Sequence, residues 1–274
     1  MKLETFVNLS YEVVMNDSIF PGFHGARRAV VVLKQNDIRS SRNDLSYEEK
    51  QFLFDDEAFV LSYPPPSDSP ALPRALMNII DSDLARPGLV LVQSPYDRDA
   101  YVELEKAAEA FAIEKMRHFS RLCQLLGASF VEAEQVEVKR GTESAVYSVK
   151  GSAGPVKAEG KVSTDEEQSL SRKFSIRSIF PGKAPDGEGA EKFLRSKNLF
   201  GDTVMRQLLE QCSDVSNRLL EQQVTISLSS ETKSTLGVVG KLNLPTKFGI
   251  SADCKRIATS SEEYSLTLLV KFES

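Results

Sequence analysis

Apolar and polar residues alternate most regularly at the C-terminal end of the chain. Every second position there is apolar, and the series is Tyr264, Leu266, Leu268, Val270 and Phe272. Ser265, Thr267 and Lys271 stand between them, and Leu269 breaks the alternation. Because successive side chains of a strand point to opposite faces, this pattern predicts a strand with one buried and one solvated face, as antiparallel sheets allow.

The first hundred residues contain short apolar runs separated by turn residues. The runs with the length and β-branched content of strands are 5–14, Ala29–Lys34, 57–62 and 88–93. Three consecutive prolines within 63–70 predict a loop, and a short helix is expected at about 73–81. This part of the chain is therefore predicted to be mixed α/β.

A long helix is predicted at 97–126. Asp97 or Asp99 can accept hydrogen bonds from its first free amides, and Gly127 stands where a left-handed residue ends a helix. Lys115 is the exception on an otherwise apolar face, whose members are Leu104, Ala108, Phe111, Phe119, Leu122 and Leu126.

The chain also shows a weak internal repeat. A second helix is expected at about 189–222, and a displacement of 90 residues aligns 136–180 with 226–270 and gives seven identities. We interpret this as a duplicated unit, one long helix followed by an antiparallel meander of about four strands.

These patterns predict an α+β fold in two portions. An acidic α/β portion is expected at 1–96, and a duplicated portion of helix and antiparallel sheet at 97–274. The repeat units within the second portion are expected at about 97–180 and 189–274.

Composition and charge narrow the class of protein. With 41% hydrophobic and 27% charged residues, the 274-residue chain has the composition of a soluble globular protein. The net charge is −5, and the acidic excess lies in residues 1–100, which hold 10 Lys and Arg against 15 Asp and Glu. A nucleic-acid partner is therefore not expected, and the N-terminal portion is the predicted electrostatic recognition surface.

The cysteines, the histidines and the N-terminus favour a reduced, cytoplasmic protein. Cys123, Cys212 and Cys254 are far apart, and the chain has only two histidines, so we expect no metal and no cofactor. The N-terminus lacks the apolar core of a signal peptide, and no apolar run is long enough to span a bilayer as a helix. Any recruitment to a membrane would then occur through the surface or through assembled β-hairpins.

The best candidate for a ligand site is the segment around His24, Arg27 and Arg28. Arginine matches phosphate oxygens with two parallel hydrogen bonds, so a glycine-flanked histidine with two arginines suits an anion. The alternative, which we favour because no phosphate-binding glycine motif accompanies these residues, is a turn with solvated arginines before a strand.

Other reactive residues are better explained by structure. His118 and Cys123 are five positions apart on one helix, about 140° around its axis, so they cannot form a dyad, whereas Glu114 and His118 are spaced to touch. The acidic groups at 55–57, 81/83 and 97/99 are expected to cap helices and to aid solubility.

Three functional hypotheses follow. The first is a non-enzymatic binding or assembly protein that uses its β-rich units to engage a protein partner or itself. The second is a membrane-acting, pore-forming-like effector with two β-hairpin regions, in a setting such as bacterial defence. In it, the strand of Tyr264, Leu266, Leu268, Val270 and Phe272 meets lipid. The third is an enzyme acting on a phosphate or nucleotide around His24, Arg27 and Arg28. No catalytic residue is assigned.

Overall fold

The computed structural model describes most of the chain as an α+β fold. The described residues are 20–44, 46, 49–65, 72–149, 157–158, 164–214, 219–245, 248–259 and 262–272. Helices and antiparallel and parallel strands are mixed along these ranges, which confirms the predicted α+β class. The strand expected at 5–14 lies outside the described residues.

The N-terminal part forms a four-stranded sheet, which we call sheet A. Its strands are β1 (Ala29–Lys34), β2 (Ala58–Tyr63), β3 (Val90–Gln93) and β4 (Tyr101–Glu103), in the order β2-β1-β3-β4. β1 pairs with β2 in parallel and with β3 in antiparallel orientation. The surrounding elements are η1 (His24–Arg27), α1 (Gln35–Asp44), η2 (Gln51–Phe54) and α2 (Arg74–Asp81).

Sheet A is covered on both faces, which explains the continuous apolar sequence of β1. Val30 and Val32 belong to a small cluster with Leu76 and Ile79 of α2. The alternate residues of the strand, Val31 among them, belong to the large core that continues through the rest of the molecule. The predicted strands at Ala29–Lys34, 57–62 and 88–93 are confirmed, each within two residues.

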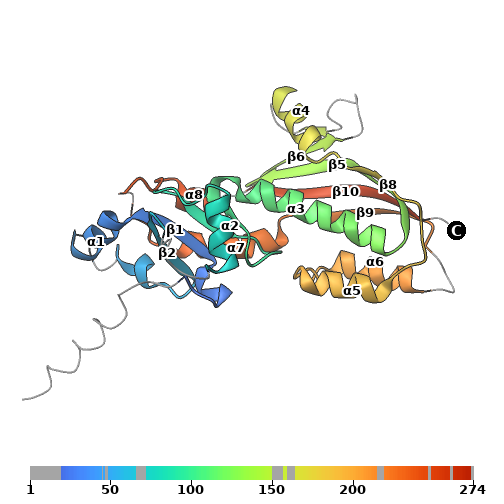
Figure 1. Ribbon diagram of the computed structural model, residues 1–274. Helices are drawn as coiled ribbons and strands as arrows, with labels where there is room; N and C mark the ends of the chain where they lie inside the picture. Colours follow the sequence, from blue (N-terminus) through green and yellow to red (C-terminus); the bar gives the residue numbers. More distant parts are fainter. Residues whose placement is uncertain are drawn as a thin grey trace, which may run out of the picture.

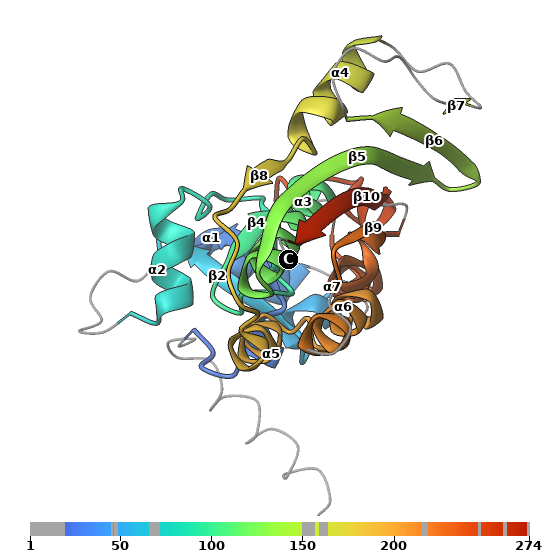
Figure 2. The same cartoon turned by 90° about the vertical axis from the view of Figure 1, so that its right-hand side faces the viewer.

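The second sheet, sheet B, is built around two long strands. It consists of β5 (Ala128–Arg140), β6 (Glu143–Ser148), β7 (Lys157–Ala158), β9 (Glu221–Ser227) and β10 (Glu263–Phe272), in the order β7-β6-β5-β10-β9, and β8 (Arg177–Ile179) pairs with β5. β5 and β10 run antiparallel along their whole length, with register shifts after Thr267 and after Lys271. Figure 2 shows β5 curving away from the body, with β6 and α4 (Thr164–Lys173) beside it.

β10 has the two faces that its sequence predicts. Tyr264, Leu266, Leu268 and Val270 are buried, and Phe272 is partly buried against the same core. The alternate residues are half-exposed. The strand is flanked on both sides, by β5 and by β9.

The helices differ from the prediction at their ends. The helix expected at 97–126 is α3 (Leu104–Leu125), because 101–103 extends sheet A as β4. The prediction of a single helix at 189–222 is wrong. α5 (Gly187–Ser196) and α6 (Thr203–Ser213) are separate helices, and β9 begins at Glu221. The chain turns between them at Asn198, which has a φ of 55°, and Asp202 then accepts hydrogen bonds from the amides of Val204 and Met205 and so begins α6.

The structure does not confirm the duplicated unit. Two helices, α7 (Ser230–Lys241) and α8 (Cys254–Thr259), lie between β9 and β10, where a meander was expected. Ser144 of β6 and Ser234 of α7, which the alignment matched, therefore stand in a strand and in a helix. The reason lies in the spacing of the buried side chains of α7. Four of the five (Thr232, Thr235, Leu236 and Val239) follow the helical period, and Val238 is the fifth.

The two sheets lie toward opposite ends of an elongated molecule (Figure 1). α3 runs along sheet B and contacts α5, α6 packs against α5 and β9, and α7 and α8 lie beyond sheet B, where α7 contacts β3 of sheet A. One continuous core contains residues of β1 and β3 together with residues of α3, α7 and β10. The segment after position 96 thus contributes β4, α7 and α8 to the surroundings of sheet A.

Candidate functional site

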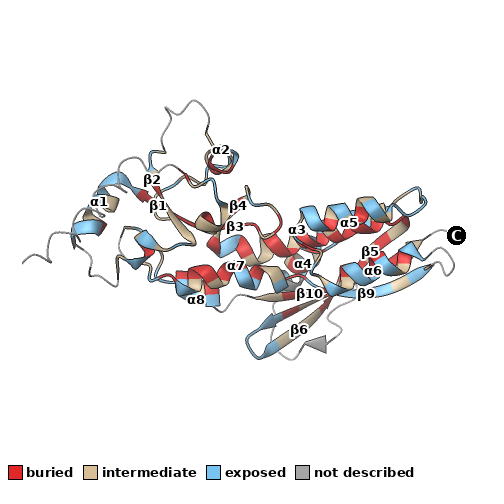
Figure 3. Ribbon diagram, turned by 90° about the horizontal axis from the view of Figure 1, so that it is seen from below, coloured by how far each residue is buried: buried red, intermediate tan, exposed pale blue. Residues whose placement is uncertain are grey.

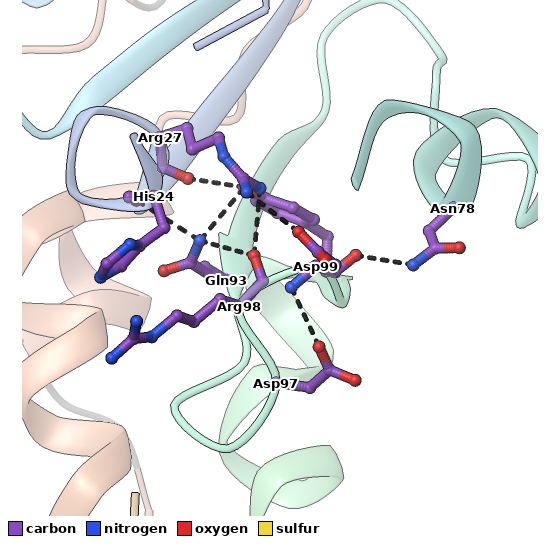
Figure 4. Close-up of polar contacts among 8 residues, drawn as sticks. His24, Arg27, Asn78, Gln93, Asp97, Arg98 and Asp99 are labelled. Atoms are coloured by element: carbon purple, nitrogen blue, oxygen red, sulfur yellow. Dashed lines mark hydrogen bonds and ion pairs between the residues drawn. The ribbon is translucent and has the colours of Figure 1, made fainter. Parts of the chain in front are cut away.

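Arg27 is the centre of a buried polar cluster at the end of sheet A (Figure 4). Its side chain is 7% exposed. One terminal nitrogen donates to the carbonyl of Arg98 at 3.0 Å and to the hydroxyl of Tyr101 at 2.9 Å, and the other donates to Asp99 Oδ1 at 2.9 Å. The guanidinium also lies 5.3 Å from the ring centre of Phe20. Its Nε has no hydrogen-bond partner among the described residues.

Neighbouring side chains fix the same turn. The Tyr101 hydroxyl donates to the carbonyl of Arg27 at 2.9 Å, and Gln93 Nε2 donates to the carbonyl of Arg98 at 2.8 Å. Asn78 Nδ2 donates to the carbonyl of Asp99 at 2.9 Å. The terminal nitrogens of Arg27 are therefore engaged in holding the turn between β3 and β4, and they do not point into an open site.

Of the other two residues of the predicted anion site, Arg28 is engaged elsewhere and His24 lies beside the Arg27 cluster. Arg28 forms an ion pair with Glu57 at 2.5 Å and donates to the carbonyl of Ser234 in α7 at 3.0 Å. His24 lies beside the side chain of Arg98 (Figure 4), and its pKa is lowered by burial and by the positive charges of Arg98 and Arg27. The lowered pKa favours a neutral imidazole. The three residues are close in sequence, but the guanidinium groups of Arg27 and Arg28 are bound to other protein groups.

A second polar cluster, centred on Lys115, was not predicted as a site. Lys115 is on the buried face of α3 and is 0% exposed. Its ammonium group lies 2.7 Å from Asp202 Oδ2 and 2.7 Å from Glu231 Oε2, and it donates to Ser230 Oγ at 3.0 Å. The cluster thus joins α3 to the start of α6 and to the start of α7.

Aromatic and polar groups of the 94–97 turn extend the Lys115 cluster. The Tyr96 hydroxyl donates to Glu231 Oε2 at 3.4 Å, and burial, together with the carboxylates of Glu231 and Glu114, raises the pKa of Tyr96. Ser94 Oγ donates to Glu114 Oε2 at 2.9 Å and accepts from the amide of Tyr96 at 3.1 Å. These groups satisfy one another, so the cluster works as a connector between helices.

The predicted pairing of Glu114 with His118 is confirmed. His118 Nε2 lies 3.5 Å from Glu114 Oε1. The imidazole stands edge-on between the rings of Tyr96 and Phe193, at 5.5 Å and 5.7 Å between centroids. Cys123 is fully buried, and burial raises the pKa of its thiol well above the ordinary value, which disfavours the thiolate.

The strand expected to meet lipid is in the interior of this structure. The rings of Tyr264 and Phe174 lie 5.1 Å apart, and Leu266, Leu268 and Val270 are in the same core as α3. Phe272 is partly buried at the end of this row. Contact with lipid would therefore require these side chains to leave the core.

The end strand of sheet B has backbone groups that are open to a partner. Leu228 donates to the carbonyl of Tyr264, and Phe272 donates to the carbonyl of Leu220, both at 2.8 Å. Antiparallel pairing alternates, so the N–H and C=O groups of Glu221, Gln223, Thr225 and Ser227 point away from β10. No described residue forms a hydrogen bond with these outward backbone groups. All four residues are exposed, and the exposed positions of β9, beside β10, are in pale blue in Figure 3.

A hollow of about 290 Å³ lies at the end of α3, between Gly127, the 181–185 segment and Cys212.

Among the described residues, no group of three or more His, Cys, Asp or Glu side chains is arranged to hold a metal ion. None of the described helices combines the length and the apolar character that a membrane crossing requires.

Comparison with protein-family models, with curated proteins and with solved structures finds no match for the chain. The site therefore has to be interpreted from its own geometry.

Proposed function

We propose that the chain is a non-enzymatic binding and assembly protein that engages a protein partner by accepting a strand along β9. The observation that supports this is the open edge of β9, where four consecutive outward residues have exposed side chains and backbone groups free of bonds from any described residue. An open edge of this kind is a template for strand addition, in which main-chain hydrogen bonds supply affinity.

The sequence of β9 favours the same use. Edge strands that avoid pairing commonly contain a proline, a bulge or a charged residue, especially lysine. β9, with the sequence EQQVTIS, has no proline and no lysine, and its register with β10 is continuous. Its one charged residue, Glu221, stands at the first position and is paired with Lys271. Leu220, immediately before the strand, is 55% exposed and offers an apolar contact to an added strand.

A peptide-display selection tests the proposal. Extended peptides selected on the wild-type protein should lose binding to Thr225→Pro, because proline removes one outward N–H without removing a hydrogen bond to β10. Thr225 also contacts Thr267 through their hydroxyls at 3.0 Å, so Thr267→Ala is the matched control and should bind normally. Equal binding by all three proteins, or no peptide selected at all, contradicts the proposal.

The two other hypotheses make different demands on the protein. The membrane-acting alternative needs the apolar face of β10 to separate from α3, and leakage of liposomes is its direct test. The phosphate-binding alternative needs Arg27 and Arg28 free for ligand, yet Arg27 supports the turn before β4. A loss of activity in Arg27→Ala would therefore have to be separated from a loss of folding.

A further inference from the structure

We infer that the strand added to β9 comes from a second copy of this chain, paired antiparallel about a two-fold axis at Val224. This inference rests on the proposed use of β9 and names its partner. Two features of β9 indicate this partner: which of its residues have outward N–H and C=O groups, and the order of its side chains.

The backbone phase selects the register. The outward groups are on Glu221, Gln223, Thr225 and Ser227. A two-fold axis at Val224 places Gln223 opposite Thr225 of the second copy and Glu221 opposite Ser227, so each outward N–H meets a carbonyl. If the axis lay at Thr225, Glu221 would face position 229, beyond the end of β9. If the axis lay at Gln223, Ser227 would face position 219, before its start, so one residue would be unpaired in either case. Pairing at Val224 therefore satisfies the whole edge.

The side chains are also compatible with pairing to themselves. On the exposed face, Gln223 meets Thr225 and Glu221 meets Ser227, so no charge stands opposite a like charge. Glu221 is already paired with Lys271 of β10, at 3.0 Å. On the inner face, Val224 meets the same valine of the second copy, and pairs of β-branched residues stabilise neighbouring strands. The strand is thus self-complementary.

The dimer would join two copies of sheet B into one continuous sheet, with β9 of each copy at the centre. Because the shared interface is one strand from each copy, we expect reversible association that depends on protein concentration.

Disulfide trapping tests the register. Val224 would face itself across a pair without backbone hydrogen bonds, where the Cα atoms are about 4.5 Å apart, a separation that a disulfide can span. Val224→Cys should therefore form a covalent dimer on mild oxidation. Ile226→Cys is the matched control, because the new cysteine would face Gln222 and should form no covalent dimer. The native cysteines are buried, so the wild-type protein should form no covalent dimer either. No covalent dimer of Val224→Cys, or equal dimer formation by Ile226→Cys, overturns the inference.

Sedimentation and amide exchange provide an independent test. With increasing concentration, the wild-type protein should shift toward the dimer mass, and the amides of Gln223 and Thr225 should become protected. Thr225→Pro should remain monomeric, and Thr267→Ala should dimerise like the wild type. If the wild type stays monomeric and exchange in β9 does not depend on concentration, the second copy is not the partner. The peptide selection then decides separately whether β9 binds another protein.

Discussion

At the scale of single residues, Lys115 shows how a charged side chain can be accommodated in a core. Its ammonium group has no exposure to solvent, and the loss of hydration is offset by two carboxylates and a hydroxyl within 3.0 Å. Asp202 has a second role, because its other carboxylate oxygen caps α6. The same few atoms therefore determine the start of a helix and the attachment of that helix to α3.

Replacing Lys115 by methionine should lower the free energy of unfolding by about 3–5 kcal/mol, because Asp202 and Glu231 are left buried without a counter-ion. The side chains of these partners are 9% and 18% exposed. Urea denaturation measures the change. Lys106→Met is the control: Lys106 is on the same helix but 69% exposed, and its pair with Glu103 should contribute less than about 1 kcal/mol. Similar losses in the two variants would show that the Lys115 cluster has no special role.

At the scale of elements, the end of α3 depends on one glycine. Gly127 has a φ of 85°, which confirms the left-handed stop expected from the sequence. The chain returns to this point from β8, and a Cβ on Gly127 would lie 2.2 Å from the carbonyl oxygen of Lys183. The helix stop and the close approach of the returning chain both require the absence of a side chain.

Gly127→Ala should destabilise the protein more than Gly141→Ala. Gly141, in the turn between β5 and β6, has a φ of 62°, but a Cβ there would meet no atom within 4 Å. Both variants incur the left-handed strain of about 1–2 kcal/mol. Gly127→Ala must also displace the Lys183 carbonyl, which we expect to cost a further ~1–3 kcal/mol. Thermal unfolding followed by circular dichroism measures both, and equal melting temperatures would contradict the close contact.

At the scale of the whole molecule, the two sheets depend on each other. α7 connects them, since Glu231 binds Lys115 of α3 while Ser234 accepts from Arg28 at the start of β1. β4 belongs to sheet A although it immediately precedes α3. The large core contains Val31 and Val92 of sheet A as well as Leu266 of sheet B. The molecule therefore has two sheets and one main core.

A fragment of residues 97–274 should not keep the native fold of that region. Removing 1–96 takes β3 away from β4 and exposes the core residues that face Val31 and Val92. We expect poorly dispersed amide resonances and a broad thermal transition, whereas the full chain should unfold cooperatively. A fragment whose spectrum overlays that of the full chain would show instead that 97–274 is an independent domain.

The sequence was most informative where a single element determines its own pattern. The alternation at 264–272 identified β10 and its buried face, and the apolar runs at Ala29–Lys34 and 88–93 identified two strands of sheet A. The helix end at Gly127 and the contact of Glu114 with His118 could be predicted, because both depend on residues within about one turn of a helix. The prediction of one helix at 189–222 was wrong because α5 and α6 have similar apolar spacing. The break between these helices depends on the turn at Asn198 and on the cap Asp202.

The α+β class, the burial of β10 and the end of α3 could be predicted from the sequence, because local periodicity and backbone freedom are properties of short segments. The roles of Lys115 and Arg27 depend on tertiary contacts, since their partners Asp202, Glu231 and Asp99 come from distant segments. The position of β9 at the end of sheet B likewise depends on which strands pair in the folded chain. An open edge is defined by the strand that is not beside it, and the sequence of β9 does not specify which strands lie next to it.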